Sequence, residues 1–292
     1  MLVLAALLAA DIARADVSIV DDEGRRITLT RPATRVIALY AALSDVVYSL
    51  GKEDALVART QSQTEPPSLA AKPCIGTHMR PSVEMTAALK PDLVLQMGSR
   101  AKTDEVVTAI ERVGIPVALF DAEDFESLYS VIERVGVLLG AAPQAAALIR
   151  DMQDRLQRVT RRVQGLPRPS VFYEIRYPNL LAAGRKSMVA EIIRLSGGEN
   201  CVASQRKMAR VNEEELLRLN PDIYILQQGP MNPDPLPVKD RPHFKTLAAV
   251  KNGRVYEVQE KLFSRPGPNS VRAVEELAGL LHPRAGDREV RP

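Results

Sequence analysis

Residues Glu84–Leu95 read EMTAALKPDLVL, and 130 positions later residues Glu214–Ile225 read EELLRLNPDIYI. The two stretches carry Glu, Leu, Pro and Asp at matching positions, and Leu is replaced by Ile at two further ones. Each pattern predicts a helix that ends before Pro-Asp and turns into a buried strand, because proline cannot continue a helix and restricts the residue before it. Two such units in one chain predict two lobes of similar architecture.

Short apolar strands alternate with helical patterns on both sides of this repeat. In the first half, a hairpin over 17–30 precedes predicted strands at 35–39, 55–60, 93–96 and 117–120 and predicted helices at 43–50, 82–89 and 103–113. In the second half, strands are predicted at 170–174, 223–226 and 254–258, and helices at 188–196, 213–219 and 270–281. This alternation is typical of α/β folds with parallel-rich sheets. We therefore predict two Rossmann-like α/β lobes.

Residues 143–165 are predicted to form one long helix that connects the lobes. Apolar side chains recur at helical spacing along it, at Ala146, Ile149, Met152, Leu156, Val159 and Val163. A helix of this length spans roughly 30 Å and acts as a stiff strut rather than a pliable hinge. The predicted organisation is an N-terminal lobe over 16–142, the connecting helix and a C-terminal lobe over 166–292.

The first residues indicate an exported protein. Leu2–Ala10 is an apolar run too short to span a bilayer, and a small-x-small site, Ala13-Arg14-Ala15, follows it. We interpret 1–15 as a secretory signal peptide whose basic n-region is missing; the alternative is a buried N-terminal helix. No cysteine stands directly after the predicted cleavage site, so we expect a soluble periplasmic protein without a lipid anchor.

Composition argues against several other classes. Lys and Arg together number 39 against 36 Asp and Glu, and tryptophan is absent, so no nucleic-acid partner is expected. The glycine-rich, metalloprotease and nucleophile-elbow motifs of common enzymes are missing, and we predict that the protein is not an enzyme. Cys74 and Cys201 fall in different predicted lobes, which favours free thiols over a disulfide.

The chain resembles the class III periplasmic substrate-binding proteins of ATP-binding-cassette (ABC) importers for iron chelates, haem and cobalamin. Four stretches carry the resemblance: RVIALYAALSDVVYSLG, GTHMRPSVEMTAALKPDLVL, AGRKSMVAEIIRLSGGENC and HFKTLAAVKNGRVYEV. Their order and spacing match over 17–283. The resemblance implies two α/β lobes on one backbone helix, a ligand in the cleft between them, no intrinsic cofactor, and a monomer that delivers its ligand to the importer's permease.

The resemblance also gives the repeated glutamates a role. Relatives carry one surface carboxylate per lobe at this place in the motif, and each docks on arginines of the permease. Carried over, these residues are Glu84 and Glu214, each seven residues before the proline of its repeat. The alternative is structural, because glutamate in the first turn of a helix is favoured by the helix macrodipole.

The cleft is expected where strands end, since ligands of open α/β sheets bind at the carboxyl edge of the strands. The predicted cleft residues are Tyr40, His78, Met79, Arg80 and Arg100 in the first lobe and Arg176, Tyr177, Arg185, Arg210 and Arg265 in the second. The many arginines favour an anionic ligand, because a guanidinium forks a carboxylate bidentately. Siderophore carboxylates and haem propionates both fit this expectation.

His78 and Tyr40 are the candidates for ligating a metal that the cargo carries. A neutral imidazole suits haem iron, and a phenolate can hold ferric iron. Each side chain has a simpler alternative, which is to shape or hydrogen-bond the cleft wall. The first functional hypothesis is a binding protein for a ferric siderophore or haem. A corrinoid carrier of the same fold, an enzyme or metal-cluster protein, and a ligand-sensing signalling module are the alternatives.

Overall fold

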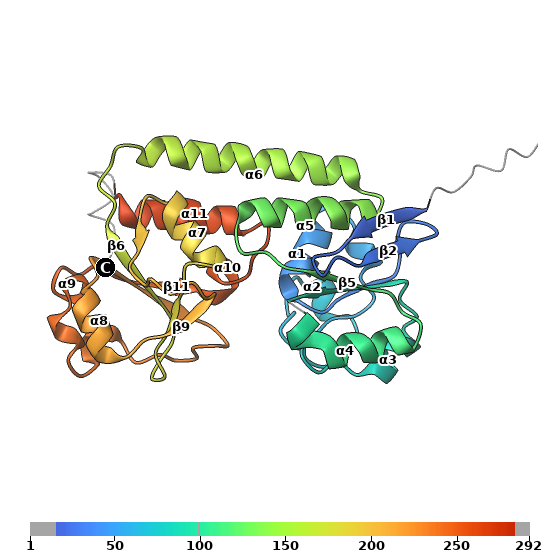
Figure 1. The fold of residues 1–292 in the computed structure, drawn as a ribbon, viewed down its shortest axis with the longest axis horizontal. Helices are drawn as coiled ribbons and strands as arrows, with labels where there is room; N and C mark the ends of the chain where they lie inside the picture. Colours follow the sequence, from blue (N-terminus) through green and yellow to red (C-terminus); the bar gives the residue numbers. More distant parts are fainter. Residues whose placement is uncertain (1–15, 99, 284–292) are drawn as a thin grey trace, which may run out of the picture.

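The computed structural model describes residues 16–98 and 100–283, and the side chains of 100–104 lie outside this description. Two α/β lobes stand side by side, and helix α6 (Ala142–Val163) runs along both of them (Figure 1). The predicted fold class is therefore confirmed. The predicted signal peptide, 1–15, falls outside the described residues, and among those described no helix combines the length and apolarity needed to cross a bilayer.

The N lobe precedes α6. Its central sheet has the order β3–β4–β5 with all strands parallel, and an antiparallel hairpin, β1–β2, lies beside it. The strands are β1 (Val17–Val20), β2 (Arg26–Leu29), β3 (Val36–Ala38), β4 (Leu93–Met97) and β5 (Val117–Phe120). The helices are α1 (Ala41–Ser49), α2 (Pro67–Ala70), α3 (Val83–Ala88), α4 (Arg100–Arg112) and α5 (Phe125–Leu138), with a 3-10 turn at Glu53–Ala55.

The C lobe follows α6 and has a mixed sheet of order β11–β10–β6–β7–β9, with β8 pairing β6. Strands β11, β10, β6 and β8 are mutually parallel, whereas β7 runs antiparallel to both β6 and β9. The strands are β6 (Ser170–Arg176), β7 (Leu181–Ala183), β8 (Glu199–Asn200), β9 (Met208–Arg210), β10 (Ile223–Gln228) and β11 (Val255–Gln259). The helices are α7 (Met188–Leu195), α8 (Glu213–Leu219), α9 (Ala248–Lys251), α10 (Glu260–Phe263) and α11 (Ser270–Leu281), with 3-10 turns at Val238–Asp240 and Phe244–Thr246.

Helix α6 belongs to both lobes. Its buried side chains recur at helical spacing, at Ala145, Met152, Leu156, Val159 and Val163, and join one core with α5, α7 and α11. Arg155 forms a bidentate ion pair with Glu275 of α11, at 2.9 and 2.7 Å. Because a buried Leu or Met side chain contributes about 1.5–3 kcal/mol, this stripe fixes the helix on both lobes.

The sequence repeat corresponds to equivalent helix-to-strand units, α3–β4 in the N lobe and α8–β10 in the C lobe. In each unit the residue before the buried proline is left-handed, with φ of 47° at Lys90 and 39° at Asn220. This conformation ends the helix, as is common at helix C-termini, and lets the chain turn into the strand. The expectation that the helix of each unit ends before Pro-Asp is confirmed.

Two expectations about single elements differ from the structure. The strand predicted at 55–60 exists only as isolated bridges, Val36 with Leu56 and Arg59 with Cys74. The stretch is extended but pairs too briefly to form a ladder. Conversely, no element is predicted for 121–142, where the structure has α5. The missed signal is its capping box, in which Asp124 accepts from the Ser127 amide while Ser127 Oγ accepts from the Asp124 amide.

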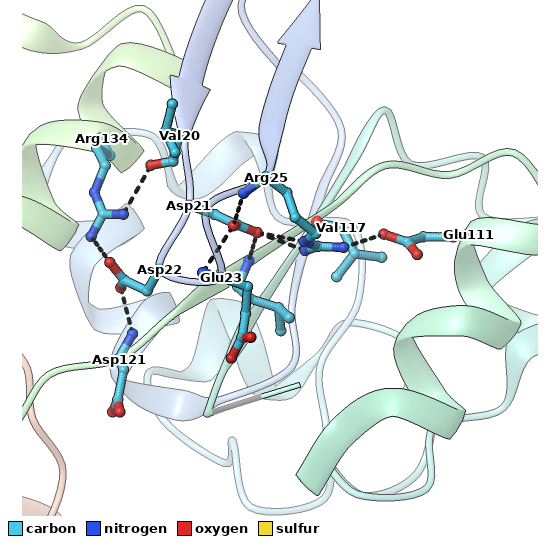
Figure 2. A network of polar contacts seen from close by, with 10 residues as sticks. Val20, Asp21, Asp22, Glu23, Arg25, Glu111, Val117, Asp121 and Arg134 are labelled. Atoms are coloured by element: carbon cyan, nitrogen blue, oxygen red, sulfur yellow. Dashed lines mark hydrogen bonds and ion pairs between the residues drawn. The ribbon is translucent and has the colours of Figure 1, made fainter. Parts of the chain in front are cut away.

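A polar network attaches the N-terminal hairpin to the edge of the central sheet (Figure 2). The buried Asp21 carboxylate accepts from the Leu119 amide at 3.2 Å and from the Arg25 guanidinium, which also donates to Val117 O and pairs with Glu111. In the same view Asp22 pairs with an arginine of α5 and accepts from the amide of Asp121. The network therefore fixes the end of β5, where the chain reaches the lobe boundary.

Candidate functional site

A cavity of about 480 Å³ lies between the two lobes. Its N-lobe wall consists of residues from α1, from α2 and from the loop directly before α2. Its C-lobe wall consists of residues from the end of β11, from α10, from α11 and from the loop between these two helices. We call this cavity the inter-lobe pocket. Its lining is Ala41, Ser44, Asp45, Ser62, Gln63, Thr64, Glu65, Leu69, Gln259, Lys261, Leu262, Arg265, Asn269, Arg272 and Glu276.

Gln63 fixes the N-lobe wall. Its buried amide donates to Ala38 O at 2.9 Å and to Ser44 Oγ at 2.7 Å, and its carbonyl accepts from the Thr60 amide at 2.6 Å. These bonds join the loop to the end of β3 and to α1. The backbone on this side of the pocket is therefore held in place before any ligand arrives.

A second buried glutamine fixes the C-lobe wall. The Gln227 side-chain carbonyl accepts from Ser264 Oγ and, at 3.1 Å, from the hydroxyl of Tyr173. Ser264 directly precedes Arg265 in the sequence. On the other side of Arg265, Ser270 Oγ donates to Arg265 O at 3.3 Å and accepts from the Gly267 amide at 3.2 Å. The backbone of Arg265 is thus held on both sides.

The Arg265 guanidinium itself has no hydrogen bond or ion pair with any described residue. It is half-buried and reaches the N lobe electrostatically. Burial raises the pKa of Tyr40, which the positive charge of Arg265 opposes. Burial likewise raises the pKa of Asp45 to about 6, again against Arg265. One cation from the C lobe therefore faces a phenol and a carboxyl of the N lobe.

Tyr40 and His78, which are both predicted cleft residues, lie together. Their rings meet edge to face with centroids 5.4 Å apart. The buried Gln96 amide donates to His78 O at 3.1 Å, which holds the histidine loop against β4. Burial lowers the pKa of His78, so its imidazole is neutral at neutral pH. A neutral imidazole is the form that ligates a metal.

Arg176 is the last residue of β6 and Tyr177 follows it, at the carboxyl edge of the C-lobe sheet. Arg176 Nε is buried and has no hydrogen-bond partner in the described part of the chain. Tyr177 is a wall residue with strong internal contacts, because the Arg241 guanidinium lies 3.9 Å from its ring centroid and its amide donates to Asn232 Oδ1. The buried Glu174 pairs with Arg241 and so supports this edge.

The other predicted cleft residues are scattered. Arg210 lies on the same edge as Arg176, since Leu181 of β7 is in register with both. Arg185 follows β7, whose antiparallel direction carries it to the opposite edge, where it lines a second cavity of about 470 Å³. Met79 is 48% exposed and Arg80 is exposed on the loop before α3. The Arg100 side chain falls among those outside the described residues.

Within the described part of the chain, two lysines of the C lobe form ion pairs across the lobe boundary. Lys261 of α10 lies 3.0 Å from Glu65 of the N lobe, beside the inter-lobe pocket. Lys207 of the C lobe pairs with Asp121 and lies 3.6 Å from Glu123. In both cases the C lobe supplies the lysine and the N lobe supplies the carboxylate. All of these side chains are at least one-third exposed, so each pair is weak.

The repeated glutamates lie on the surface. Glu84 is in the first turn of α3 and Glu214 in the first turn of α8, and both are exposed. Neither carboxylate has a hydrogen bond or ion pair with a residue that the structure describes. The caps of these helices are Ser82 and Asn212, whose side chains accept from backbone amides. The glutamates are therefore not needed to cap the helices.

Several pocket residues are absent from the predicted set. Gln259 ends β11, so the strand-end rule finds it once the predicted strand is extended by one residue. Asp45 is the lone carboxylate in an apolar helix, which is a detectable signal in AALSDVVYSL. Lys261, Arg272 and Glu276 carry no signal in the sequence, because charged residues at helical spacing usually face solvent.

No three His, Cys, Asp or Glu side chains among the described residues gather closely enough to hold a metal ion. Both cysteines are free and half-buried, and burial raises the pKa of Cys201 to about 12. The inter-lobe pocket is instead polar, and Arg265 is the predicted cleft residue among those that line it; Tyr40 and His78 stand together on the N lobe outside this lining. Such a site is suited to binding a ligand between two lobes.

Two α/β lobes on one long helix, facing each other across a polar pocket, define a bilobal ligand-binding protein. The chain belongs to the periplasmic binding protein family, whose model matches residues 36–262. An uncharacterised ABC transporter substrate-binding lipoprotein of Bacillus subtilis (strain 168) is 28% identical over 273 residues, which is 91% of this chain and 86% of that protein. The predicted family is therefore confirmed.

Further relatives are named for what they bind. A cobalamin-binding protein of Halobacterium salinarum (strain ATCC 29341 / DSM 671 / R1) is 26% identical over 275 residues, covering 90% of this chain and 73% of that protein. Among solved structures, a periplasmic haem-binding protein from Pseudomonas aeruginosa is similar with a TM-score of 0.76 and 24% identity, over 87% of this chain and 94% of that chain. The likeness to the solved structure is one of fold.

Proposed function

We propose that the chain captures an anionic metal chelate, a ferric siderophore or haem, between its lobes and delivers it to an ABC importer. The observation that carries this proposal is the unpaired guanidinium of Arg265, which lines the inter-lobe pocket from a backbone position that Ser270 holds. A half-buried guanidinium without a partner is costly unless a ligand supplies one. A carboxylate of the cargo satisfies it bidentately.

Two N-lobe residues outside the pocket lining, His78 and Tyr40, support a cargo that contains a metal. His78 is neutral because burial lowers its pKa, and its ring rests against Tyr40. A neutral imidazole can enter the coordination sphere of a chelated iron. Tyr40 is less suited while the site is empty, because burial raises its pKa and keeps the phenol protonated. We therefore favour His78 as the metal-contacting residue.

A corrinoid cargo is the second candidate, and the likeness to a cobalamin-binding protein over 90% of this chain favours it. Tyr40, His78 and Tyr177 offer the packing surface that a corrin ring needs. The two candidates differ in charge, since the first needs Arg265 to bind an anion. A neutral corrinoid does not supply an anionic partner for this guanidinium.

Delivery to the importer is proposed to use Glu84 and Glu214. Both carboxylates are exposed, and each stands at the same position of its repeat on a different lobe. A permease that binds both with arginines senses the spacing of the lobes, because charge-assisted contacts fix register and orientation. We propose that the protein acts in this way as a monomer in the periplasm.

The test begins with native mass spectrometry of protein purified without refolding. Tyrosine fluorescence titrations with haemin, cyanocobalamin and a panel of ferric siderophores then measure affinity. We expect one-to-one binding of an iron chelate that carries carboxylates. Binding of cyanocobalamin alone transfers the assignment to the corrinoid candidate, and binding of no compound in the panel contradicts both.

Matched arginine variants decide whether the pocket is the binding site. Arg265→Gln is expected to weaken the anionic chelate by about tenfold or more, since a charge-assisted hydrogen bond contributes about 1.5–3 kcal/mol. Arg218→Gln is the control, because Arg218 is exposed on α8 and does not line the pocket. Equal affinities of the two variants place the cargo elsewhere.

A further inference from the structure

The inter-lobe pocket contains a carboxyl group that the proposed function does not use. Asp45 lies in the first half of α1, between the buried Ser44 and Val46, and is itself only partly exposed. No hydrogen bond or ion pair joins its carboxylate to the residues that the structure describes. A half-buried carboxylate in this position is unusual, because burial of a charge is costly without a close partner.

We propose that Asp45 is a specificity residue of the cleft, whose ionised carboxylate attracts Arg265 across the lobe boundary and whose protonation frees Arg265 for an anionic cargo group. This inference rests on the proposed function, since it presumes that Arg265 meets an anion. Its geometric basis is that both side chains line one pocket, one from each lobe. Asp45 thus stands in the pocket where the carboxylate of a ligand is expected.

The other charges around the pocket do not replace this attraction between Asp45 and Arg265. Lys261 is occupied by Glu65 at 3.0 Å. Arg272 and Glu276 lie one helical turn apart on α11 and are exposed, so solvent screens them. Glu260 of α10 and Arg265 both act on Tyr40, with opposite effects on the pKa of that phenol. Arg265 is the one charged group that shifts the Asp45 carboxyl, against the larger effect of its burial.

The protonation behaviour follows from these surroundings. Burial raises the pKa of Asp45 to about 6, and the positive charge of Arg265 opposes this rise. An anion bound to Arg265 cancels that opposition and raises the pKa further. Linkage is reciprocal, so protonation of Asp45 must strengthen anion binding by the same factor. A further rise of one pKa unit corresponds to about tenfold in affinity.

This linkage determines how the affinity for an anion changes with pH. The affinity for an anion is highest below the Asp45 pKa and falls as pH rises through it, whereas the affinity for a neutral ligand is governed by other groups. Asp45→Asn mimics the protonated form and holds the anion affinity near its low-pH value across the range. The side chain keeps its shape, so the variant should fold.

The first arm of the test needs no ligand. Carboxyl ¹³C NMR follows the titration of Asp45 in the wild type, in Arg265→Gln and in Arg265→Lys, which keeps the charge if the first variant folds poorly. We expect Asp45 to titrate near pH 6 in the wild type, higher in Arg265→Gln and near the wild-type value in Arg265→Lys. Titration near the ordinary aspartate value, or no response to Arg265→Gln, overturns the proposal.

The second arm uses ferric citrate as an anionic probe and ferrichrome as a neutral one, titrated between pH 5 and pH 8. We expect ferric citrate affinity to fall about tenfold across this range in the wild type and in the control Asp54→Asn, an exposed carboxylate outside the pocket lining, and to stay flat in Asp45→Asn. An equal fall in Asp45→Asn overturns the proposal. If neither probe binds the wild type, the proposed cargo class is in doubt, and the NMR arm alone decides the role of Asp45.

Discussion

Asp92 and Asp222 occupy equivalent places in the two lobes and make equivalent bonds. The Asp92 carboxylate accepts from the amides of Thr34 and Arg35, each at 3.0 Å, immediately before β3. The Asp222 carboxylate accepts from the amide and the hydroxyl of Ser170, each at 2.8 Å, at the start of β6. In both lobes the aspartate of the Pro-Asp repeat ties the incoming strand to the neighbour with which it pairs.

This relationship separates by role the two acidic residues that the repeat units share. The aspartate has a structural explanation in each lobe, whereas Glu84 and Glu214 have none among the described contacts. We expect Asp92→Asn and Asp222→Asn each to lower the free energy of unfolding by about 0.5–1.5 kcal/mol, because solvent-exposed strand amides lose a charged acceptor. Urea denaturation measures this loss. Glu84→Gln and Glu214→Gln should leave the midpoint unchanged, and a comparable loss in either one would return the glutamates to the fold.

The docking assignment predicts a loss of delivery without a loss of binding. Glu84→Lys combined with Glu214→Lys should abolish ligand-dependent stimulation of the importer's ATPase, because the reversed charges repel the permease arginines. Ligand affinity, measured by fluorescence titration, should be unchanged. Glu53→Lys and Glu213→Lys are the controls, since both residues are exposed carboxylates at helix starts outside the repeat positions. Loss of affinity in the double variant is the outcome that contradicts docking.

The ion pairs across the boundary predict an effect on lobe arrangement rather than on stability. Lys207→Gln combined with Lys261→Gln removes both pairs. Each is solvent-exposed and contributes about 1 kcal/mol or less, so the unfolding midpoint should hardly move. Spin labels on the two lobes should report a broader distance distribution by pulsed electron resonance. High salt should broaden the wild-type distribution in the same way, and an unchanged width in both cases shows that α6 alone sets the arrangement.

Much of this fold is predictable because it follows from local sequence patterns. The Pro-Asp repeat gives both helix-to-strand units, and the apolar spacing of Met152, Leu156 and Val159 gives the backbone helix. The strand-end rule places Tyr40 and Arg176 correctly at their sheet edges. The rule does not predict the sheet edge at which Arg185 lies, because it assumes a parallel strand and β7 runs antiparallel to β6.

The electrostatics of the site are not predictable in this way. Asp45 and Arg265 belong to different lobes, and their proximity depends on how α6 sets one lobe against the other. The same holds for Lys261 and Glu65, which are distant in sequence and meet only across the boundary. A sequence pattern reports the face of a helix but not the partner opposite that face.

The buried pair Glu174–Arg241 predicts the largest effect on stability. Both side chains are fully buried, and Arg241 also donates to Leu236 O and stacks on Tyr177. Glu174→Ala leaves a buried guanidinium unpaired and should cost about 3–5 kcal/mol in the free energy of unfolding. Glu191→Ala, which breaks the exposed pair with Arg194, should cost about 0.5 kcal/mol or less and serves as the control. Denaturant titration distinguishes them, and equal losses would mean that the buried pair is replaceable by its hydrogen-bond neighbours.

Two groups of the site make opposite contributions to the pH dependence of stability. Burial lowers the pKa of His78, so the unfolded chain binds its proton more readily and stability falls as pH drops below the ordinary histidine value. Burial raises the pKa of Asp45 to about 6, so the folded chain holds that proton more tightly and a charge-burial penalty present above pH 6 disappears as pH falls toward 4. Asp45→Asn should therefore be more stable than the wild type at pH 7.5 and equal to it near pH 4. His78→Gln should gain on the wild type as pH falls from 7.5 to 5. Unfolding midpoints across this range test both signs, and a gain of Asp45→Asn at low rather than high pH would show that Arg265 outweighs burial at this carboxyl.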